Sequence, residues 1–130
     1  MNDKLTTYSV SQTVSLQLTA KEVGSGSLEV FATPMMAAMM EKAAAYIAQQ
    51  YIDEDCTTVG TKLDIKHLAA SPIGADIIAT ATLIEQDGRR FVFNVEAFDN
   101  TGKIGEGEHE RFSVKVDRFM DKTKQRINNI

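Results

Sequence analysis

The feature that most constrains this chain is a run of residues that is apolar on almost every side. From Met35 to about Ile52 the sequence reads MMAAMMEKAAAYIAQQYI, and its alanine and methionine content favours helix. A helix without a polar face is usually buried on most sides. In a chain of 130 residues, only a sheet that curls around the helix can bury it. The sequence therefore predicts one long central helix inside a curved sheet.

The start of this helix carries its own signal. Thr33-Pro34 stands just before the apolar run. A threonine hydroxyl can accept a hydrogen bond from an early backbone N–H, and proline is preorganised at the first helical position. On this pattern alone we expect Thr33 to cap the helix.

The rest of the chain is expected to be largely extended. Residues 10–18 alternate apolar and polar side chains and predict a half-buried strand. Residues 21–27 contain two glycines and two serines, which predict a break before a short extended piece at 28–31. After an acidic turn at 53–55, four more strands are expected, at 57–67, 75–85, 90–98 and 104–116.

Short turns connect these four strands. Pro72 and Gly74 predict a bend, and Asp87-Gly88 predicts a tight turn. Consecutive strands with such connections predict an antiparallel meander, so we expect an α+β fold with a single core. The length of the chain fits one domain over residues 1–130, with residues 117–130 as a loosely packed tail that receives no assignment.

Composition and charge limit the function. The net charge of −4 argues against nucleic-acid binding, which needs a clustered basic face, but a phosphorylated small molecule needs only a few local Lys or Arg. The single cysteine, Cys56, excludes an internal disulfide and indicates a reducing, cytoplasmic location. It follows Asp53-Glu54-Asp55, whose charges disfavour a thiolate. The polar start at Met1-Asn2-Asp3-Lys4 does not resemble a signal peptide, and no segment approaches the roughly 20 apolar residues of a membrane span.

Isolated side chains are the remaining candidates for chemistry. His67 and His109 lie far apart in the sequence and do not form a zinc motif with Cys56, so we expect no metal and no separate cofactor. Glu41 interrupts an apolar helix, where a carboxylate is normally excluded. It lies either on a narrow solvated stripe beside Lys42 or in a semi-buried site as a base or nucleophile. His67 ends a predicted strand before a bend, a place for either a binding group or a structural histidine.

Several segments together resemble a known family. VFATPMMAAMMEKAA, VGTKLDIKHLAASPIG, DGRRFVFNVEAFD and IGEGEHERF are similar to the hotdog thioesterases of the fluoroacetyl-CoA thioesterase family, over roughly residues 28–119. The resemblance implies a hotdog fold, an acyl-CoA thioesterase activity on a short acyl group, coenzyme A only as part of the substrate, and a homodimer or higher homo-oligomer. It also implies a catalytic set and two substrate contacts, which here are Thr33, Glu41 and His67, with Gly60 at the acyl group and Arg111 beside it.

The spacing of the catalytic set constrains how it is assembled. Eight helical residues rise about 12 Å, so Thr33 and Glu41 of one chain cannot easily hydrogen-bond. Either Thr33 lies in a loop that folds back, or the site draws groups from two subunits. The two-fold pairing common to such folds favours the second alternative.

One departure concerns the acyl group. In the fluoroacetyl-CoA enzyme, aromatic residues before the VFAT segment cover the acyl group, whereas residues 24–27 here are Gly-Ser-Gly-Ser. This argues against fluoroacetyl-CoA as the substrate and leaves the acyl group open. Lys66, Arg89 and Arg90 are candidates for the CoA phosphates, although such charged side chains are usually just solvated. The competing interpretations are a non-catalytic hotdog module that binds an acyl-CoA and, with less support, a hotdog dehydratase.

Overall fold

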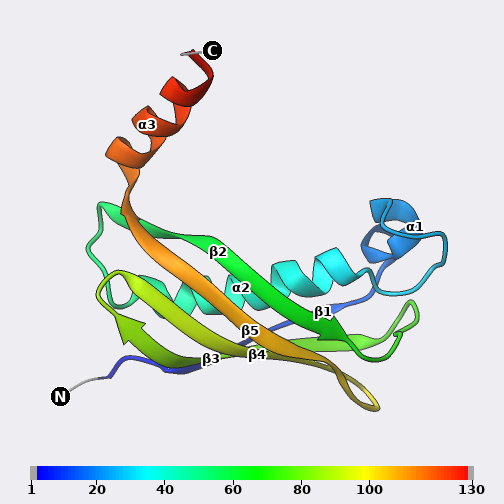
Figure 1. The fold of residues 1–130 in the computed structure, drawn as a ribbon. Coiled ribbons are helices and arrows are strands. Elements are labelled where there is room, and N and C mark those ends of the chain that lie inside the picture. The colour runs from blue at the N-terminus through cyan, green and yellow to red at the C-terminus, as the bar shows by residue number, and fades with distance from the viewer. Residues whose placement is uncertain (1–2, 129–130) are drawn as a thin grey trace.

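The computed structural model describes residues 3–128, so expectations that fall on residues 1–2 or 129–130 lie outside the described residues. Within them, five strands form one antiparallel sheet: β1 (Thr7–Thr13), β2 (Cys56–His67), β3 (Asp76–Asp87), β4 (Arg90–Asp99) and β5 (Gly102–Lys115). The helices are η1 (Leu16–Leu18), α1 (Ala20–Val23), α2 (Thr33–Gln49) and α3 (Val116–Asn128). The sheet curves around α2 (Figure 1), which confirms the expected α+β arrangement.

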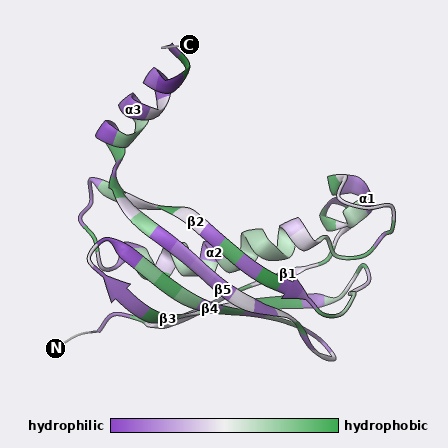
Figure 2. Cartoon of the chain, viewed as in Figure 1, coloured by the Kyte–Doolittle hydropathy of each residue, from purple (hydrophilic) through white to green (hydrophobic). Residues whose placement is uncertain are grey.

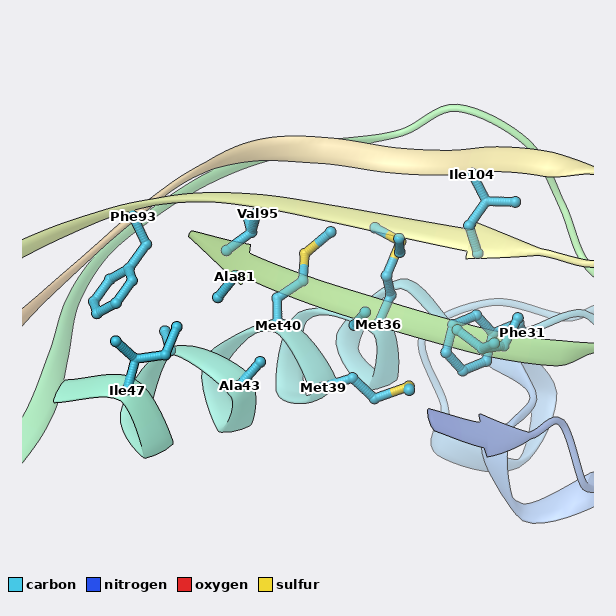
Figure 3. Packing of buried hydrophobic residues seen from close by; sticks show 14 of the residues in the cluster. Phe31, Met36, Met39, Met40, Ala43, Ile47, Ala81, Phe93, Val95 and Ile104 are labelled. Atoms are coloured by element: carbon cyan, nitrogen blue, oxygen red, sulfur yellow. The ribbon is translucent and has the colours of Figure 1, made fainter. Parts of the chain in front are cut away.

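The core lies between α2 and the concave face of the sheet. Met36, Met40 and Ile47 of the helix are fully buried, and Figure 3 shows Ile47 facing Phe93 and Met40 facing Val95, both of β4. Their spacing of three to four residues places them on one helix face. The other face stays open, because the side chains at residues 38, 42, 46 and 49 are exposed. The expectation of burial on most sides therefore holds for one face of the helix only.

The order of strands in the sheet is β1-β3-β4-β5-β2. Strands β3, β4 and β5 form the expected meander, but β2 pairs with β5 and not with β3, so the expected four-strand meander is wrong at β2. The segment after β2 is tied to the chain before α2, where Phe31 N–H donates to Ser71 O at 2.8 Å. This longer connection lets the chain cross the sheet. In the described part of the chain, β2 is an edge strand.

The N-terminal prediction needs two corrections. The strand expected at 10–18 is instead β1, which ends at Thr13, followed by the short helix η1. Val14 and Leu18 are buried while Leu16 is exposed, so the apolar alternation there comes from a helical turn. The expected break at 21–27 begins with α1, which ends at Gly24 with a φ of 90°, a value that favours glycine.

The C-terminal segment, which received no assignment from the sequence, is a helix. α3 follows β5 directly, and each of its residues is exposed. Figure 1 shows α3 projecting away from the sheet, and Figure 2 shows that it is mostly hydrophilic with scattered apolar positions. Among residues 3–128, the helices are too short or too polar to cross a membrane.

Candidate active site

The start of α2 lies beside the end of β2, which brings Thr33 to His67. Thr33 Oγ1 lies 2.7 Å from His67 Nδ1, at hydrogen-bond distance. The cap position of α2 is Ala32, and no side chain caps the helix. The capping role expected for Thr33 is therefore wrong. Its hydroxyl is paired with the histidine ring instead.

Only one ring nitrogen of His67, Nδ1, takes part in this hydrogen bond, and the other, Nε2, is unpaired. Nε2 is buried and has no hydrogen-bond partner among the described residues. Burial lowers the pKa of His67 below its usual value of 6.5, so the ring is neutral at pH 7. A half-buried, neutral imidazole with an unpaired nitrogen can exchange a proton with a bound ligand.

Glu41 belongs to a second cluster, two turns further along α2. The helix turns its half-buried carboxylate toward β2, while the neighbouring Lys42 is exposed. A Cβ atom at Gly60 would lie 3.0 Å from Glu41 Oε2, 3.2 Å from His109 Cε1 and 3.4 Å from Arg111 Nη1. Gly60 thus borders a space, too tight even for an added methyl group, between a carboxylate, an imidazole and a guanidinium. Of the two interpretations of Glu41, the structure has the semi-buried one.

Arg111 is held rigidly at this space. Its Nε donates to Thr58 Oγ1 at 2.8 Å and its Nη2 donates to the Thr58 carbonyl at 2.9 Å. His109 Nδ1 lies 2.8 Å from the Lys62 carbonyl, and because a carbonyl only accepts, Nδ1 carries the proton. His109 Nε2 therefore accepts from Arg111 Nη1, at 3.2 Å. Burial and the Arg111 charge lower the pKa of His109, which keeps it the neutral acceptor that this network needs.

Two members of this network were not foreseen as site residues, namely His109 and Thr58. Period-2 alternation could have found His109, because residues 109, 111 and 113 of β5 are all buried while those between them are less so. The same alternation places Arg111 and His109 on the concave face. Thr58 gives no such signal, because its role depends on the pairing of β2 with β5.

The two clusters are separate in one chain. Thr33 is joined to His67, and Glu41 lies with Gly60 and Arg111, but no hydrogen bond or ion pair connects the two groups among residues 3–128. This agrees with the helix rise of about 12 Å between Thr33 and Glu41.

A shallow pocket of about 330 Å³ opens beside Thr33 and His67. Its walls come from the segment between α1 and α2 and from the segment after β2, and they include Ser25, Val30, Leu68 and Ala70. Ser25 belongs to the Gly-Ser segment 24–27, so small side chains stand where the resemblance had pointed to an aromatic cover. The pocket does not reach Glu41.

Two other candidate residues, Arg90 and Cys56, lie outside this site. Arg90, one of the basic residues considered for CoA phosphates, forms ion pairs with Glu110 at 3.0 Å and Glu85 at 3.2 Å. Cys56 begins β2, and desolvation with the adjacent Asp55 raises the pKa of its thiol. Within the described residues, no cluster of three or more His, Cys, Asp or Glu side chains is arranged to hold a metal ion.

Comparisons with known proteins point to one family. The family model described as "Fluoroacetyl-CoA-specific thioesterase" matches residues 14–117. A fluoroacetyl-CoA thioesterase from Streptantibioticus cattleyicolor is 36% identical over 98 residues, which are 75% of this chain and 70% of that protein.

Solved structures give the same result. A structure of the fluoroacetyl-CoA thioesterase superposes with a TM-score of 0.86 at 30% identity, covering 92% of this chain and 93% of that one. A thioesterase superfamily member from Thermus thermophilus superposes with a TM-score of 0.85 at 25% identity, covering 95% and 94%. A hot-dog-like protein from Thermanaerovibrio acidaminovorans gives 0.84 at 25% identity, covering 93% and 90%. The expected hotdog fold is confirmed.

Proposed function

The chain belongs to the fluoroacetyl-CoA-specific thioesterase family, and from this premise we propose that it hydrolyses a short acyl-CoA thioester with Thr33, Glu41 and His67. The observation that carries the proposal is the His67 ring, which Thr33 holds at Nδ1 and whose buried Nε2 has no hydrogen-bond partner among the described residues. Pure binding of an acyl-CoA has little need for such a nitrogen or for a carboxylate in an apolar helix.

Thioester hydrolysis needs a nucleophile, a path for a proton and stabilisation of the oxyanion. In one route Glu41 orients a water that attacks the carbonyl carbon, and His67, neutral at pH 7, takes the proton of that water and returns it to the departing CoA thiolate. In the other route Glu41 itself attacks, which releases the CoA thiolate and leaves an acyl–glutamyl anhydride, and a water that gives its proton to His67 then hydrolyses this anhydride. The N-terminus of α2 places the positive end of the helix dipole near Thr33, which favours the negative charge that develops.

We further propose that two copies of the chain share each site. Strand β2 has one unpaired edge in the described chain, and two such edges can pair antiparallel about a two-fold axis. With the axis through Asp64, residues equally far from it lie opposite each other and face the same side of the sheet. The β-bulge between Gly60 and Lys62 adds one residue to this count, so Gly60 of one copy lies across from His67 of the other. This register brings the Thr33–His67 pair of one copy to the Glu41 carboxylate of its partner.

The surroundings of Gly60 limit the acyl group. Glu41, His109 and Arg111 lie so close to Gly60 that even an added Cβ atom would be crowded, so we expect a small acyl group beside Gly60, in polar surroundings. The substrate need not be the one named for the relatives, because Gly-Ser residues replace bulky side chains at 24–27. The relatives support coenzyme A as the carrier, since one solved variant of the fluoroacetyl-CoA thioesterase contains fluoroacetate and CoA. We also propose a cytoplasmic location and no metal or separate cofactor.

A panel of acyl-CoA thioesters, followed by release of the free thiol, tests this function. We expect turnover of at least one short acyl-CoA, and a loss of about a hundredfold or more in kcat for Glu41→Ala and His67→Ala. Unchanged turnover in both variants would remove the proposed site. Binding of acyl-CoA without turnover by the wild type would instead support the non-catalytic module.

A further inference from the structure

Helix α3 carries an apolar stripe that the other described residues, within 3–128, leave exposed. Val116, Met120 and Ile127 lie on one face of this helix, with Phe119 at its border. Their side chains are 39%, 44%, 73% and 36% exposed, in the order Val116, Met120, Ile127 and Phe119. A helix of 13 residues is only marginally stable by itself in water. The stripe therefore needs a surface to pack on.

The position where α3 begins indicates where the surface that packs on its apolar stripe lies. Lys115, the last residue of β5, pairs with Cys56, the first residue of β2. Figure 1 shows α3 rising from this corner past the β2 side of the sheet, at the end of the molecule opposite α1. The helix thus extends beyond the unpaired edge strand, into the space where the proposed second copy lies.

We infer that α3 packs on a second copy of the chain and forms an outer wall of that copy's substrate pocket. This inference rests on the proposed pairing of two copies along β2. In an antiparallel pair, the start of one β2 lies beside the end of the other. The α3 of one copy then stands next to His67 and Leu68 of its partner, where the pocket opens.

The receiving surface is apolar. Leu68, which lines the pocket, is 51% exposed, and Leu28, on the segment that borders it, is 67% exposed. The intervening wall at 24–27 contains only glycine and serine. The apolar stripe of α3 matches the two exposed leucines, and it supplies the bulk that the Gly-Ser segment lacks. Burial of apolar area on both sides favours this contact.

Cysteine cross-linking tests the contact without using activity, so it stands apart from the test of the proposed reaction. In a Cys56→Ser background, one full-length chain carries Met120→Cys and a second carries Leu68→Cys or Leu28→Cys. After mixing and mild oxidation we expect a disulfide-linked dimer. The two positions lie at opposite ends of β2, about 36 Å apart along the strand, so the bond must join two chains.

Gln125→Cys is the matched control, because Gln125 is on the same helix but faces away from the stripe. We expect its cross-linking to Leu68→Cys or Leu28→Cys to be at least tenfold slower. Equal rates for Met120→Cys and Gln125→Cys, or no cross-link with either leucine position, would overturn the inference. Binding of α3 to anionic lipid vesicles, weakened by Met120→Asp while no cross-link forms, would identify a membrane as the occupant instead.

A kinetic readout then tests the role of α3 as a wall. Met120→Asp is expected to raise KM about tenfold for the preferred acyl-CoA with little change in kcat, while Gln125→Asp leaves both unchanged. A fall in kcat with an unchanged KM would contradict the assignment of α3 to the pocket wall.

Discussion

Gly60 lacks a side chain where the charged and polar groups of the site converge. An added Cβ would press on Glu41 Oε2 at 3.0 Å and on His109 Cε1 at 3.2 Å. The carboxylate is the flexible end of a side chain and can move aside, so we expect Gly60→Ala to fold normally. The displaced carboxylate should lower kcat/KM by about tenfold to a hundredfold.

Thiol-release kinetics and thermal melting together check this prediction. A melting temperature within a few degrees of wild type shows that the fold is intact. A wild-type kcat/KM in Gly60→Ala would contradict the prediction that activity depends on the position of the Glu41 carboxylate.

The pH dependence of activity is argued from His67. Burial lowers the pKa of this side chain below 6.5, and the proposed mechanism uses the neutral ring. The rate constant kcat/KM should therefore be flat at neutral pH and fall as pH drops through the lowered pKa.

Thr33→Val, which removes the hydroxyl partner of the His67 ring, should lower kcat, whereas Thr33→Ser, which keeps the hydroxyl, should retain most of the activity. A pH–rate profile for each variant decides this.

Stability depends on pH through His109 in a similar way. Its pKa is lowered in the folded state, so below about pH 6.5 the unfolded chain binds more protons than the folded one. The free energy of unfolding therefore decreases as the pH is lowered through this range. The loss continues until pH reaches the folded pKa, at about 1.4 kcal/mol per pH unit at most. Charged groups around His109 are Glu41, Arg111 and Glu110. Urea unfolding between pH 5 and 7 should be less pH-dependent in His109→Gln than in wild type.

Single residues could be singled out from the sequence, but their partners could not. Glu41 was conspicuous because a carboxylate is rare in an apolar helix. The hydroxyl of Thr33 was expected at a backbone N–H, whereas it is paired with His67, because an end of a distant strand competes for it. The network of His109 depends on the carbonyl of Lys62, a contact that no local pattern encodes.

At the scale of elements, Gly107 of β5 lies directly against the backbone of β2. A Cβ on Gly107 would clash with the backbone carbonyl of Asp64 and lie 2.7 Å from Ile65 Cα. Backbone cannot move aside cheaply, so Gly107→Ala should lower the free energy of unfolding by about 3 kcal/mol.

Gly105→Ala is the matched control on the same strand. There the added Cβ would meet mainly the thioether of Met36, with Sδ at 2.5 Å, and methionine adapts its rotamer readily. We expect a loss of about 1 kcal/mol. Urea unfolding of both variants measures the difference, and equal losses would contradict the role of the Asp64 carbonyl.

Elements with local signals were predicted well from the sequence. The helix α2, the turn at residues 87–88 and strands β3 to β5 follow from composition, turn residues and alternation. The segment 14–18 was predicted wrongly, because its apolar spacing suits a strand as well as a helical turn. The place of β2 at the sheet edge was also missed, since it depends on pairing between distant segments.

At the scale of the whole molecule, sharing of the site between two copies makes a sharp prediction. Glu41→Ala and His67→Ala should each be nearly inactive. In a mixed dimer, one site combines the intact His67 of one chain with the intact Glu41 of the other. Random exchange makes half the dimers mixed, each with one working site, so mixing should restore about a quarter of wild-type activity.

Equal amounts of the two variants, exchanged by mild denaturation and refolding, provide the measurement. The control is each variant put through the same treatment alone. A mixture that stays as inactive as its components would show that one chain builds the whole site.

The unpaired edge of β2 also links activity to the abundance of the protein. If a working site exists only where two edges have met, dilution below the dissociation constant of the pair removes sites faster than it removes chains. In that range the reaction rate scales with the square of the chain concentration. A cell that makes few copies would leave its acyl-CoA pool almost untouched, and a modest rise in expression would switch hydrolysis on.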